Sequence, residues 1–250
     1  MSHLNGKHVV ITGGSNGIGF ATAERFAQQG AKVLVTGSSQ ASVDAAIERG
    51  NNAFSGIVCD LTTMSDLDAL AAKAATELSH VDIFFANAGL AHFKPLAEIT
   101  ETLYDEVMNV NVKGLFFSIQ RIVPLMKPGG VVVVTGSIAP RKGQHGLAVY
   151  GGSKGAARAI VRNLASELLD LGIRINCLAP GPVHTNIFSR MTGGNESEAQ
   201  AVVDRISATV PLKRVATPEE IAEAVEFMTG PGAAYMVGSE LTLDGGKAEL

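Results

Sequence analysis

Short apolar segments alternate with longer segments of mixed polarity along the whole 250-residue chain. Several of the short segments, such as VVVVTG at 131–136, are apolar at nearly every position. That pattern is typical of strands buried on both faces of a parallel sheet. The strands that it predicts are 7–12, 32–37, 53–59, 81–86, 131–136, 173–179 and 240–244.

The longer segments carry apolar residues three and four positions apart, which is the spacing of an amphipathic helix. The predicted helices are 21–29, 42–49, 64–78, 102–126, 155–170 and 218–228. Strands that alternate with helices are joined by right-handed crossovers. The pattern therefore predicts an α/β fold with a doubly wound, seven-stranded parallel sheet flanked by helices. No linker or shift in composition interrupts it, so we expect a single domain over 1–250.

The composition is that of a compact protein, because 46% of the residues are hydrophobic and 18% are charged. A net charge of -4 argues against a nucleic-acid partner. The N-terminal segment has no apolar stretch of signal-peptide length, and no run approaches the ~18 apolar residues of a membrane helix. We therefore expect a cytoplasmic protein with no membrane partner.

The cysteines and histidines indicate neither a disulfide nor a metal site. The two cysteines, Cys59 and Cys177, are expected to be free buried thiols in a chain of this kind. The six histidines show no ligand spacing such as HxxxH. The sequence therefore predicts no structural metal site.

A glycine-rich turn, TGGSNGIG at 12–19, follows the first predicted strand and opens the first helix. Glycine lets the backbone turn tightly and approach a pyrophosphate, and the helix directs its positive N-terminal end at the phosphates. A tight strand-to-helix turn without a ligand is the simpler interpretation. We favour nucleotide binding because the turn lies in the first βα connection. The residues expected to contact the cofactor are Gly13, Ser15, Asn16, Gly17, Ile18 and Gly19.

The end of the second strand indicates which nucleotide is bound. NAD enzymes usually place an acidic residue there, on the ribose 2′-hydroxyl, and the segment 36–40 (TGSSQ) has none. The missing carboxylate permits a 2′-phosphate, although no Arg or Lys stands there either. The hydroxyls of Ser38 and Ser39, next to Gly37, could bind that phosphate; a polar turn with Ser39 as a helix cap is the simpler reading. We favour NADP and keep NAD as the alternative.

Two further strand ends are expected to contact the cofactor. Asp60, with Leu61, follows the third strand and could meet the adenine amino group, or it could be a helix cap or turn residue. Asn87, Ala88 and Gly89 follow the fourth strand, where small residues would let a flat ligand lie against the backbone. Open α/β sheets bind ligands at these carboxyl ends.

Three residues near the fifth strand predict acid–base chemistry. Ser137 ends that strand, and Tyr150 and Lys154 follow one helical turn apart. Residues four positions apart share a helix face, so the Lys154 ammonium is expected to lower the pKa of Tyr150. Tyr150 would then act as general acid or base, and Ser137 would orient a carbonyl oxygen. A tyrosine–lysine pair at this spacing is otherwise usually a solvated helix face.

Taken together, these motifs resemble the classical short-chain dehydrogenase/reductase (SDR) family over the full length of the chain. The matching segments are TGGSNGIG (12–19), NAG (87–89), NVNVKG (109–114), Ser137, YGGSK (150–154), LAPGPVHT (178–185), PLKRVATPEEIA (211–222) and GSELTLDGG (238–246). The resemblance implies a Rossmann fold with strand order 3-2-1-4-5-6-7, which separates the two cysteines and supports free thiols. It also implies a homotetramer built on the helices near 102–126 and 151–170.

The resemblance further implies the roles of the site residues. The catalytic tetrad would be Asn111, Ser137, Tyr150 and Lys154. In that family the tyrosine exchanges a proton with the substrate oxygen, the lysine also binds the nicotinamide ribose, and the asparagine holds a water linked to the lysine. The residues that match the segment touching the nicotinamide carboxamide are Pro180, Gly181, Val183 and Thr185.

The substrate pocket would, by the same resemblance, be lined by His92, Phe93, residues 139–145, Leu147 and the region 182–191. Arg141, Lys142 and His145 add positive charge that could favour an anionic substrate or simply be solvated. Residues 186–210 contain the polar segment TGGNESEAQ (192–200), which is either a substrate lid or an ordinary surface loop.

The function expected is that of an NADP(H)-dependent oxidoreductase that interconverts a small-molecule ketone and a secondary alcohol. A 3-oxoacyl carrier-protein reductase is the alternative, but it would need basic residues for an acidic carrier, and the chain offers few. A regulator that binds NADP(H) without turnover is a third candidate. The complete tetrad argues against it.

Overall fold

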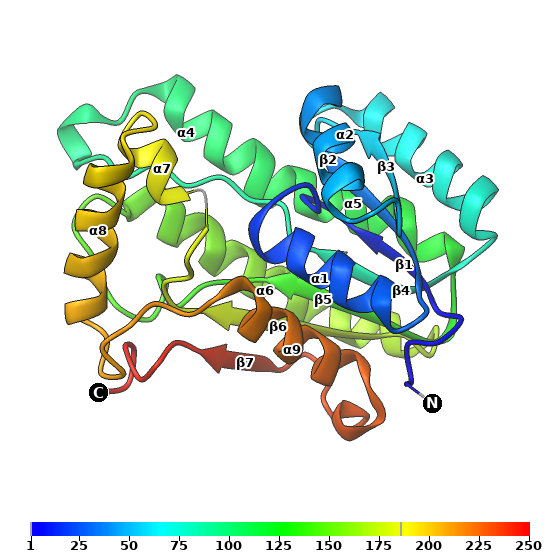
Figure 1. Cartoon of the computed structure of the whole chain (residues 1–250). Coiled ribbons are helices and arrows are strands. Elements are labelled where there is room, and N and C mark those ends of the chain that lie inside the picture. Colours follow the sequence, from blue (N-terminus) through cyan, green and yellow to red (C-terminus); the bar gives the residue numbers. More distant parts are fainter. Residues whose placement is uncertain (1, 186) are drawn as a thin grey trace.

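The computed structural model describes residues 2–185 and 187–250, and within them seven parallel strands form one sheet (Figure 1). The strand order is β3-β2-β1-β4-β5-β6-β7, as the family resemblance implied. The expected doubly wound α/β fold is therefore confirmed. The strands are β1 (His8–Ile11), β2 (Lys32–Gly37), β3 (Ser55–Val58), β4 (Val81–Ala86), β5 (Met126–Thr135), β6 (Arg174–Pro180) and β7 (Glu240–Leu243).

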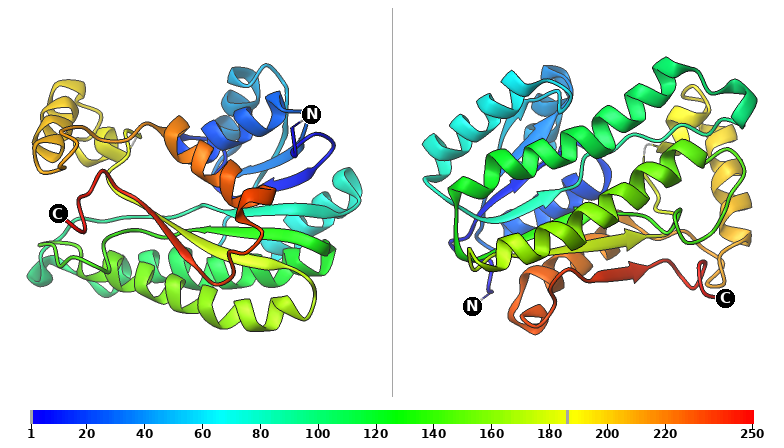
Figure 2. Two further views of the ribbon diagram at one scale, coloured as in Figure 1. Left: turned by 90° about the horizontal axis from the view of Figure 1, so that it is seen from below. Right: turned by 180° about the vertical axis from the view of Figure 1, so that it is seen from behind.

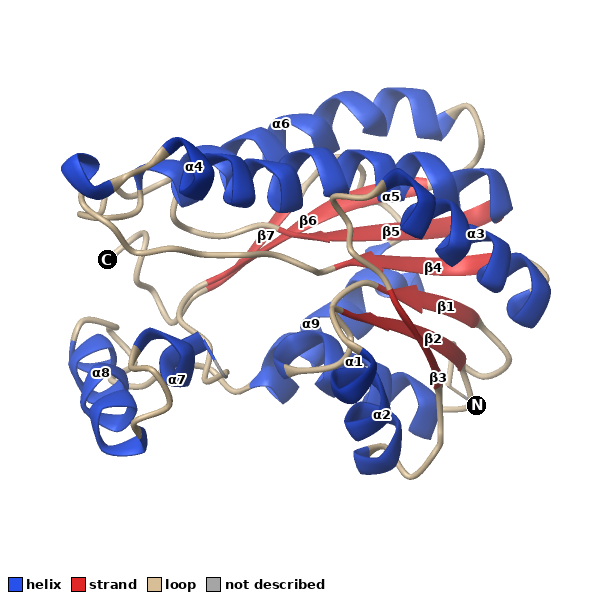
Figure 3. Cartoon of the chain, turned by 90° about the horizontal axis from the view of Figure 1, so that it is seen from above, coloured by secondary structure: helices blue, strands red, loops and turns tan. Residues whose placement is uncertain are grey.

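Helices cover both faces of the sheet (Figure 3). One face carries α3 (Met64–Leu78), α4 (Glu101–Met108), α5 (Leu115–Ile122) and α6 (Ala148–Leu169). The other carries α1 (Gly17–Gln28), α2 (Gln40–Arg49) and α9 (Pro218–Thr229). Each face has its own apolar core, because the central strands are buried on both sides. Short 3₁₀ turns lie at Leu96–Glu98, Val123–Leu125 and Pro231–Ala233.

The expected single helix over 102–126 is wrong in its middle and at its end. The chain forms α4, then a π-helical segment at Asn109–Gly114, then α5, and it leaves the helix for a 3₁₀ turn that contains Pro124. From Met126 it is extended, so β5 begins five residues earlier than the apolar run at 131–136 predicts. Apolar spacing does not reveal a π segment, which keeps the same buried face.

Helix α6 begins at Ala148 rather than at 155, so three glycines lie inside it (151, 152 and 155). Packing against the sheet supports their helical conformation, because Ser153, Lys154 and Ala157 on the same helix are buried. The polar segment 192–200 is also partly helical. Asn195 caps α8 (Glu196–Ala208) by accepting a hydrogen bond from the Glu198 N–H.

Cys59 and Cys177 are both buried and free, which confirms the free-thiol prediction. Cys177 lies inside β6.

A short helix, α7 (Ile187–Met191), and α8 project beside the main body (Figure 2). In the part of the chain that the structure describes, no helix combines the length and apolar character needed to cross a membrane.

Candidate active site

A hydrogen-bond network centred on Asn87 joins the carboxyl ends of three central strands. The amide nitrogen of Asn87 donates to the backbone oxygens of Thr12 (3.2 Å) and Gly13 (3.3 Å) after β1. Its amide oxygen accepts from Thr135 Oγ1 at the end of β5 (3.1 Å). The Thr12 hydroxyl accepts from the backbone N–H groups of Asn87 and Ala88. Asn87 therefore holds together the edge at which α/β sheets bind ligands.

Two glycines of the turn 12–19 are required by contacts within the chain. Gly13 has a φ of +64°, and a Cβ there would lie 2.9 Å from Ala88 Cα. A Cβ on Gly19 would lie 2.3 Å from the Gly13 oxygen, closer than real side chains come. These glycines let α1 pack close to the end of β4. A tight strand-to-helix turn therefore explains Gly13 and Gly19, whether or not a ligand is bound.

The N-terminus of α1 fits the phosphates of a dinucleotide. Its first turn holds no acidic residue that would repel an anion. The N–H groups of the first turn of a helix have no intrahelical partner, and they carry partial positive charge. A pyrophosphate would satisfy both properties, so the chain's own residues suit this group.

Arg49 is a basic residue of this region that the sequence analysis missed. It ends α2, yet its guanidinium donates to the backbone oxygen of Ser15 (2.6 Å) and lies 4.3 Å from the Phe20 ring centroid. A Cβ on Gly37 would lie 3.1 Å from Ser15 Oγ, so the glycine-rich turn adjoins the end of β2. Residues 36–40, which directly follow the strand, contain no cationic side chain. Arg49 brings one to the end of β2 from the far end of the following helix.

The segment after β2 is a capped helix start. Ser39 Oγ accepts from the Ser42 N–H (3.2 Å), and the Ser42 hydroxyl pairs with the Ser39 backbone in a capping box. Ser38 is exposed beside it. The expectation that Ser39 caps a helix is confirmed. Contact of Ser38 or Ser39 with a phosphate stays a prediction.

Asp60 is a turn residue rather than a helix cap. Its Oδ1 accepts from the backbone N–H (2.9 Å) and the hydroxyl (2.8 Å) of Thr62, and the N-cap of α3 is Thr63. A cleft of about 550 Å³ opens beside Asp60 and extends to Val110. The side chain of Leu61 is buried in the core, so only its backbone can meet a ligand. The adenine contact at this edge stays a prediction.

Lys154 is buried behind the Asn87 network. Its side chain lies in the interior, and Nζ donates to the backbone oxygen of Thr135 (2.7 Å). A Cβ on Gly89 would lie 3.2 Å from Nζ, so the ammonium sits against the segment 87–89. Burial lowers the pKa of Lys154 to about 8, because the charged form loses its hydration. The lysine therefore stays cationic at pH 7.

Tyr150 lies one turn before Lys154, with Lys154 Nζ 5.9 Å from the centre of its ring. The expectation that Lys154 lowers the pKa of Tyr150 is wrong for this structure. Burial raises the pKa of Tyr150, and a hydrogen bond with Ser137 offsets only part of that rise. The physical reason is that the loss of hydration on burial disfavours the charged phenolate. The Lys154 ammonium instead donates to the Thr135 backbone oxygen.

Ser137 is brought against Tyr150 by the turn that follows β5. The Ser137 hydroxyl accepts from the Ala139 N–H (3.0 Å), which bends the chain back toward α6. Its hydrogen bond with Tyr150 then links the end of β5 to the first turn of that helix. Ser137, Tyr150 and Lys154 thus converge, as the sequence predicted.

Asn111 lies in the π-helical segment, and three hydrogen bonds to residues outside that segment hold its side-chain amide. Its amide oxygen accepts from the Leu90 N–H (2.8 Å), and its amide nitrogen donates to the Leu90 oxygen (2.8 Å) and to Ser153 Oγ (2.9 Å). The Ser153 hydroxyl donates to the backbone oxygen of Tyr150 (2.7 Å). Asn111 thereby ties the segment after β4 to α6. Single π turns inside helices are frequent at functional sites.

The segment after β6 crosses this edge toward the glycine-rich turn. Pro180 ends β6, and a Cβ on Gly181 would lie 2.7 Å from Asp244 Cα, so this part packs against the chain after β7. Val183 is buried. A Cβ on Gly17 would lie 3.1 Å from Thr185 Cγ2. The four residues expected near the nicotinamide therefore lie on one strip that ends beside the glycine-rich turn.

The charged residues of the predicted substrate loop are engaged with the C-terminal segment. Arg141 forms ion pairs with Glu240 (2.6 Å) and Glu249 (2.8 Å), and these raise the pKa of its guanidinium. Lys142 Nζ donates to the Lys247 oxygen (3.3 Å). His145 is exposed. Position 186 of the expected lid, and the side chains of 190 and 191 in the expected pocket, lie outside the described residues.

Comparison with known proteins places the chain in a family. A family model described as enoyl-(acyl carrier protein) reductase matches residues 13–248. The chain is 38% identical over 252 residues to oxidoreductase asL5 of Sarocladium schorii, covering 100% of this chain and 99% of that protein. It is 36% identical over 250 residues to dehydrogenase/reductase SDR family member 4 of Bos taurus, covering 98% and 88%. The chain belongs to the short-chain dehydrogenase/reductase family of oxidoreductases.

Solved structures support the same assignment for this SDR protein. An SDR structure from Brucella melitensis superposes with a TM-score of 0.90 at 28% identity and covers 99% of each chain. An actinorhodin polyketide ketoreductase solved with NADPH has a TM-score of 0.89 at 27% identity over 100% of each chain. A 3-ketoacyl-(acyl-carrier-protein) reductase from Brucella melitensis, solved with NADH, has a TM-score of 0.88 at 26% identity over 98% and 99%. SDR relatives of this fold thus bind NADPH or NADH.

Proposed function

We propose that this SDR protein is an NADP(H)-dependent oxidoreductase that interconverts a ketone and a secondary alcohol. The observation that carries the proposal is the convergence of Ser137, Tyr150 and Lys154 beside the Asn87 network and the N-terminus of α1. The nicotinamide, when bound, supplies or accepts the hydride. The rest of the chemistry is a proton transfer to or from the substrate oxygen.

Tyr150 is the proposed general acid for reduction. Because burial raises the pKa of Tyr150, the phenol is protonated at neutral pH and can donate to a carbonyl oxygen. The Ser137 hydroxyl, next to it, orients that oxygen by a hydrogen bond. In the oxidation direction Tyr150 must first lose its proton, so we expect carbonyl reduction to be the faster direction near pH 7.

Lys154 is the residue proposed to bind the nicotinamide ribose. Its ammonium, with a pKa of about 8, stays cationic at pH 7. Its Nζ lies against Gly89, where the nicotinamide ribose is expected. Asn111 positions this arrangement through Leu90 and Ser153. A water between Asn111 and Lys154 stays a prediction from the family.

The preference for NADP rests on Arg49 and on the missing acid after β2. The guanidinium lies beside Ser15, next to the strand end at which the adenosine ribose is expected. It supplies the positive charge that residues 36–40 lack. A 2′-phosphate would gain a charge-assisted partner there.

The proposed substrate is a neutral ketone. Arg141 is paired with two glutamates and Lys142 with a backbone oxygen, so the charges predicted near the pocket are already occupied. Phe93 is well exposed at this side of the molecule and offers an apolar contact. A 3-oxoacyl carrier-protein substrate remains the alternative, since one similar structure carries that name.

Helices α7 and α8, within 186–210, are the proposed substrate lid, because they project beside the main body (Figure 2). We expect nucleotide and substrate together to protect this segment from limited proteolysis.

A homotetramer is likewise proposed, with contacts between subunits through α4–α5 and α6. Light scattering on purified protein measures it directly.

The decisive experiment is Tyr150→Phe assayed on a panel of neutral ketones with NADPH and with NADH. We expect kcat to fall by about 10²–10⁴-fold, the usual contribution of acid–base catalysis. NADPH binding, followed by nicotinamide fluorescence, should persist. Unchanged turnover in Tyr150→Phe would refute the mechanism. Tight NADPH binding with no turnover of any ketone or alcohol by the wild type would instead support a regulator.

A further inference from the structure

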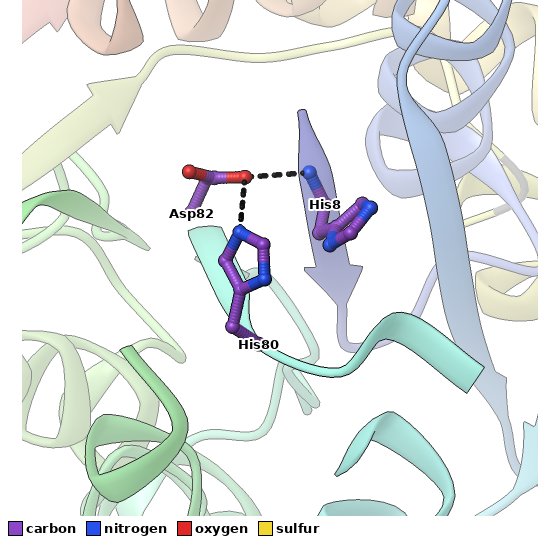
Figure 4. Close-up of side chains that lie close together, drawn as sticks. All are labelled: His8, His80 and Asp82. Atoms are coloured by element: carbon purple, nitrogen blue, oxygen red, sulfur yellow. Dashed lines mark hydrogen bonds and ion pairs between the residues drawn. The ribbon is translucent and has the colours of Figure 1, made fainter. Parts of the chain in front are cut away.

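Three ligand-type side chains meet at the end of the sheet opposite the candidate active site (Figure 4). His8 is the first residue of β1, Asp82 is the second residue of β4, and His80 immediately precedes β4. Because parallel strands start at one edge, neighbouring strand starts bring these residues together although they are far apart in the sequence. The proposed oxidoreductase reaction uses none of them.

The geometry of the cluster is compact. His80 Nε2 lies 3.4 Å from Asp82 Oδ2, and the same oxygen accepts from the His8 backbone N–H (2.8 Å). The two imidazole rings are 4.5 Å apart between centroids. One ligand atom from each side chain can be chosen so that all lie within 4.8 Å of one another. Modest side-chain rotation would let all three approach one ion.

Two observations suggest that the cluster is built to receive a cation. Among the described residues, His8 Nδ1 is a buried ring nitrogen without a hydrogen-bond partner, and leaving such an atom unpaired is costly. His80 Nδ1 lies 3.2 Å from Ser79 Oγ, so the second ring nitrogen already has a polar contact outside the cluster. Its Nε2 is then directed at Asp82.

The protonation state of the cluster also suits a metal. Burial and the neighbouring His80 lower the pKa of His8, so its imidazole is neutral at pH 7, as a ligand must be. Asp82 remains ionised, since the His8 N–H and Lys7 hold its pKa below the usual range. Lys7 binds Oδ1 (3.2 Å) and leaves Oδ2 facing the histidines. The positive charge of Lys7 weakens any cation site without blocking it.

We propose that His8, His80 and Asp82 form a binding site for a divalent transition metal, best suited to Zn²⁺. Two imidazole nitrogens and one carboxylate oxygen are a common zinc ligand set, with water as the fourth ligand. Water can reach the site, because the side chains of His80 and Asp82 are 23% and 20% exposed. The ion would tie the starts of β1 and β4 and would act on stability rather than on catalysis.

The test uses untagged, EDTA-treated full-length protein and Zn²⁺ as the probe. After equimolar loading and removal of free metal, we expect about one zinc per chain by elemental analysis and a rise in Tm. Mg²⁺ should produce neither effect, because it prefers oxygen ligands. His80→Phe keeps an aromatic ring beside His8 but removes the ligand nitrogen, so both the bound zinc and the Tm rise should disappear.

The matched control is His92→Ala. His92 also lies beside a carboxylate, that of Glu106 (3.2 Å), but this pair is not part of a three-ligand cluster among the described residues. This variant should bind zinc as the wild type does. If His80→Phe is poorly folded by circular dichroism, His8→Phe serves as the second variant. The proposal is overturned if the wild type shows no zinc-dependent rise in Tm, or if a folded cluster variant retains its zinc.

Discussion

The guanidinium of Arg49 lies 2.6 Å from the backbone oxygen of Ser15, and it thereby joins the far end of α2 to the glycine-rich turn. The contact places a positive charge where the sequence shows none after β2. The Arg49 guanidinium also lies over the Phe20 ring, and this cation–π contact helps to hold the Arg49 side chain in place. We therefore propose that the nucleotide preference depends on Arg49, at the far end of α2 rather than beside β2.

Arg49→Gln is expected to weaken NADPH binding by about 10- to 100-fold, because a hydrogen bond to a charged group contributes ~1.5–3 kcal/mol. NADH binding should change little, since it lacks the 2′-phosphate. Fluorescence titration with both nucleotides measures the difference. Arg162→Gln, at an exposed position of α6, is the control. Equal losses for NADPH and NADH would assign Arg49 to turn structure instead.

Lys154 is expected to make the free energy of unfolding depend on pH in the alkaline range. Its pKa is about 8 in the folded protein against 10.5 for an ordinary lysine, so the unfolded chain binds more protons between these values. Stability should therefore rise with pH across that window, by about 3 kcal/mol in total. Urea unfolding of wild type and Lys154→Met from pH 7 to 10.5 measures it.

The difference between these two proteins cancels the titration of every group that does not interact with Lys154; Cys177 does interact with it and titrates at higher pH. Lys113→Met, on an exposed lysine, should leave the pH dependence of the wild type unchanged. A constant difference between wild type and Lys154→Met across the window would show that Lys154 is not desolvated in the folded chain.

Gly152 is expected to serve a ligand rather than the fold. No described protein atom lies within 4 Å of the position its Cβ would take. Gly152→Ala should therefore raise the free energy of unfolding by about 0.5–1 kcal/mol, the usual gain in a helix interior. Gly152→Val, with its larger side chain, should raise KM while the protein stays folded. Urea unfolding and steady-state kinetics separate the two effects.

Gly19→Ala is the matched opposite, because its Cβ would meet the Gly13 oxygen at 2.3 Å. That variant should be destabilised. A loss of stability in both variants would mean that Gly152, too, has a structural role.

Glu240 is expected to suppress reaction with anionic substrates. It holds Arg141 at 2.6 Å and is itself largely buried. Glu240→Gln would leave Arg141 partly uncompensated, so kcat/KM for a carboxylated ketone relative to a neutral one should rise about two- to fivefold, matching ~0.5–1 kcal/mol for an exposed charge. Glu249→Gln, at the exposed partner, should have a smaller effect. An unchanged ratio in Glu240→Gln would place Arg141 away from the substrate.

The sequence by itself determined the fold and most of the candidate site. Runs such as 131–136 are apolar on both faces, and in a chain of this length only a covered parallel sheet buries them. Strand ends then converge by topology, so Ser137, Asn87 and the turn 12–19 were predictable as neighbours. Tyr150 and Lys154 followed from helical spacing.

Tertiary structure decided what local pattern cannot encode. The π segment at 109–114 keeps the apolar face of an ordinary helix, so periodicity missed it. The pKa of Tyr150 depends on burial of its phenol by packing between elements, and the Lys154 ammonium is held by the Thr135 backbone oxygen of another element. Arg49 beside Ser15, and His8 beside His80, meet only because long side chains and strand starts from distant segments are packed together. Sequence spacing fixes which residues share an element, whereas packing between elements decides which of them meet.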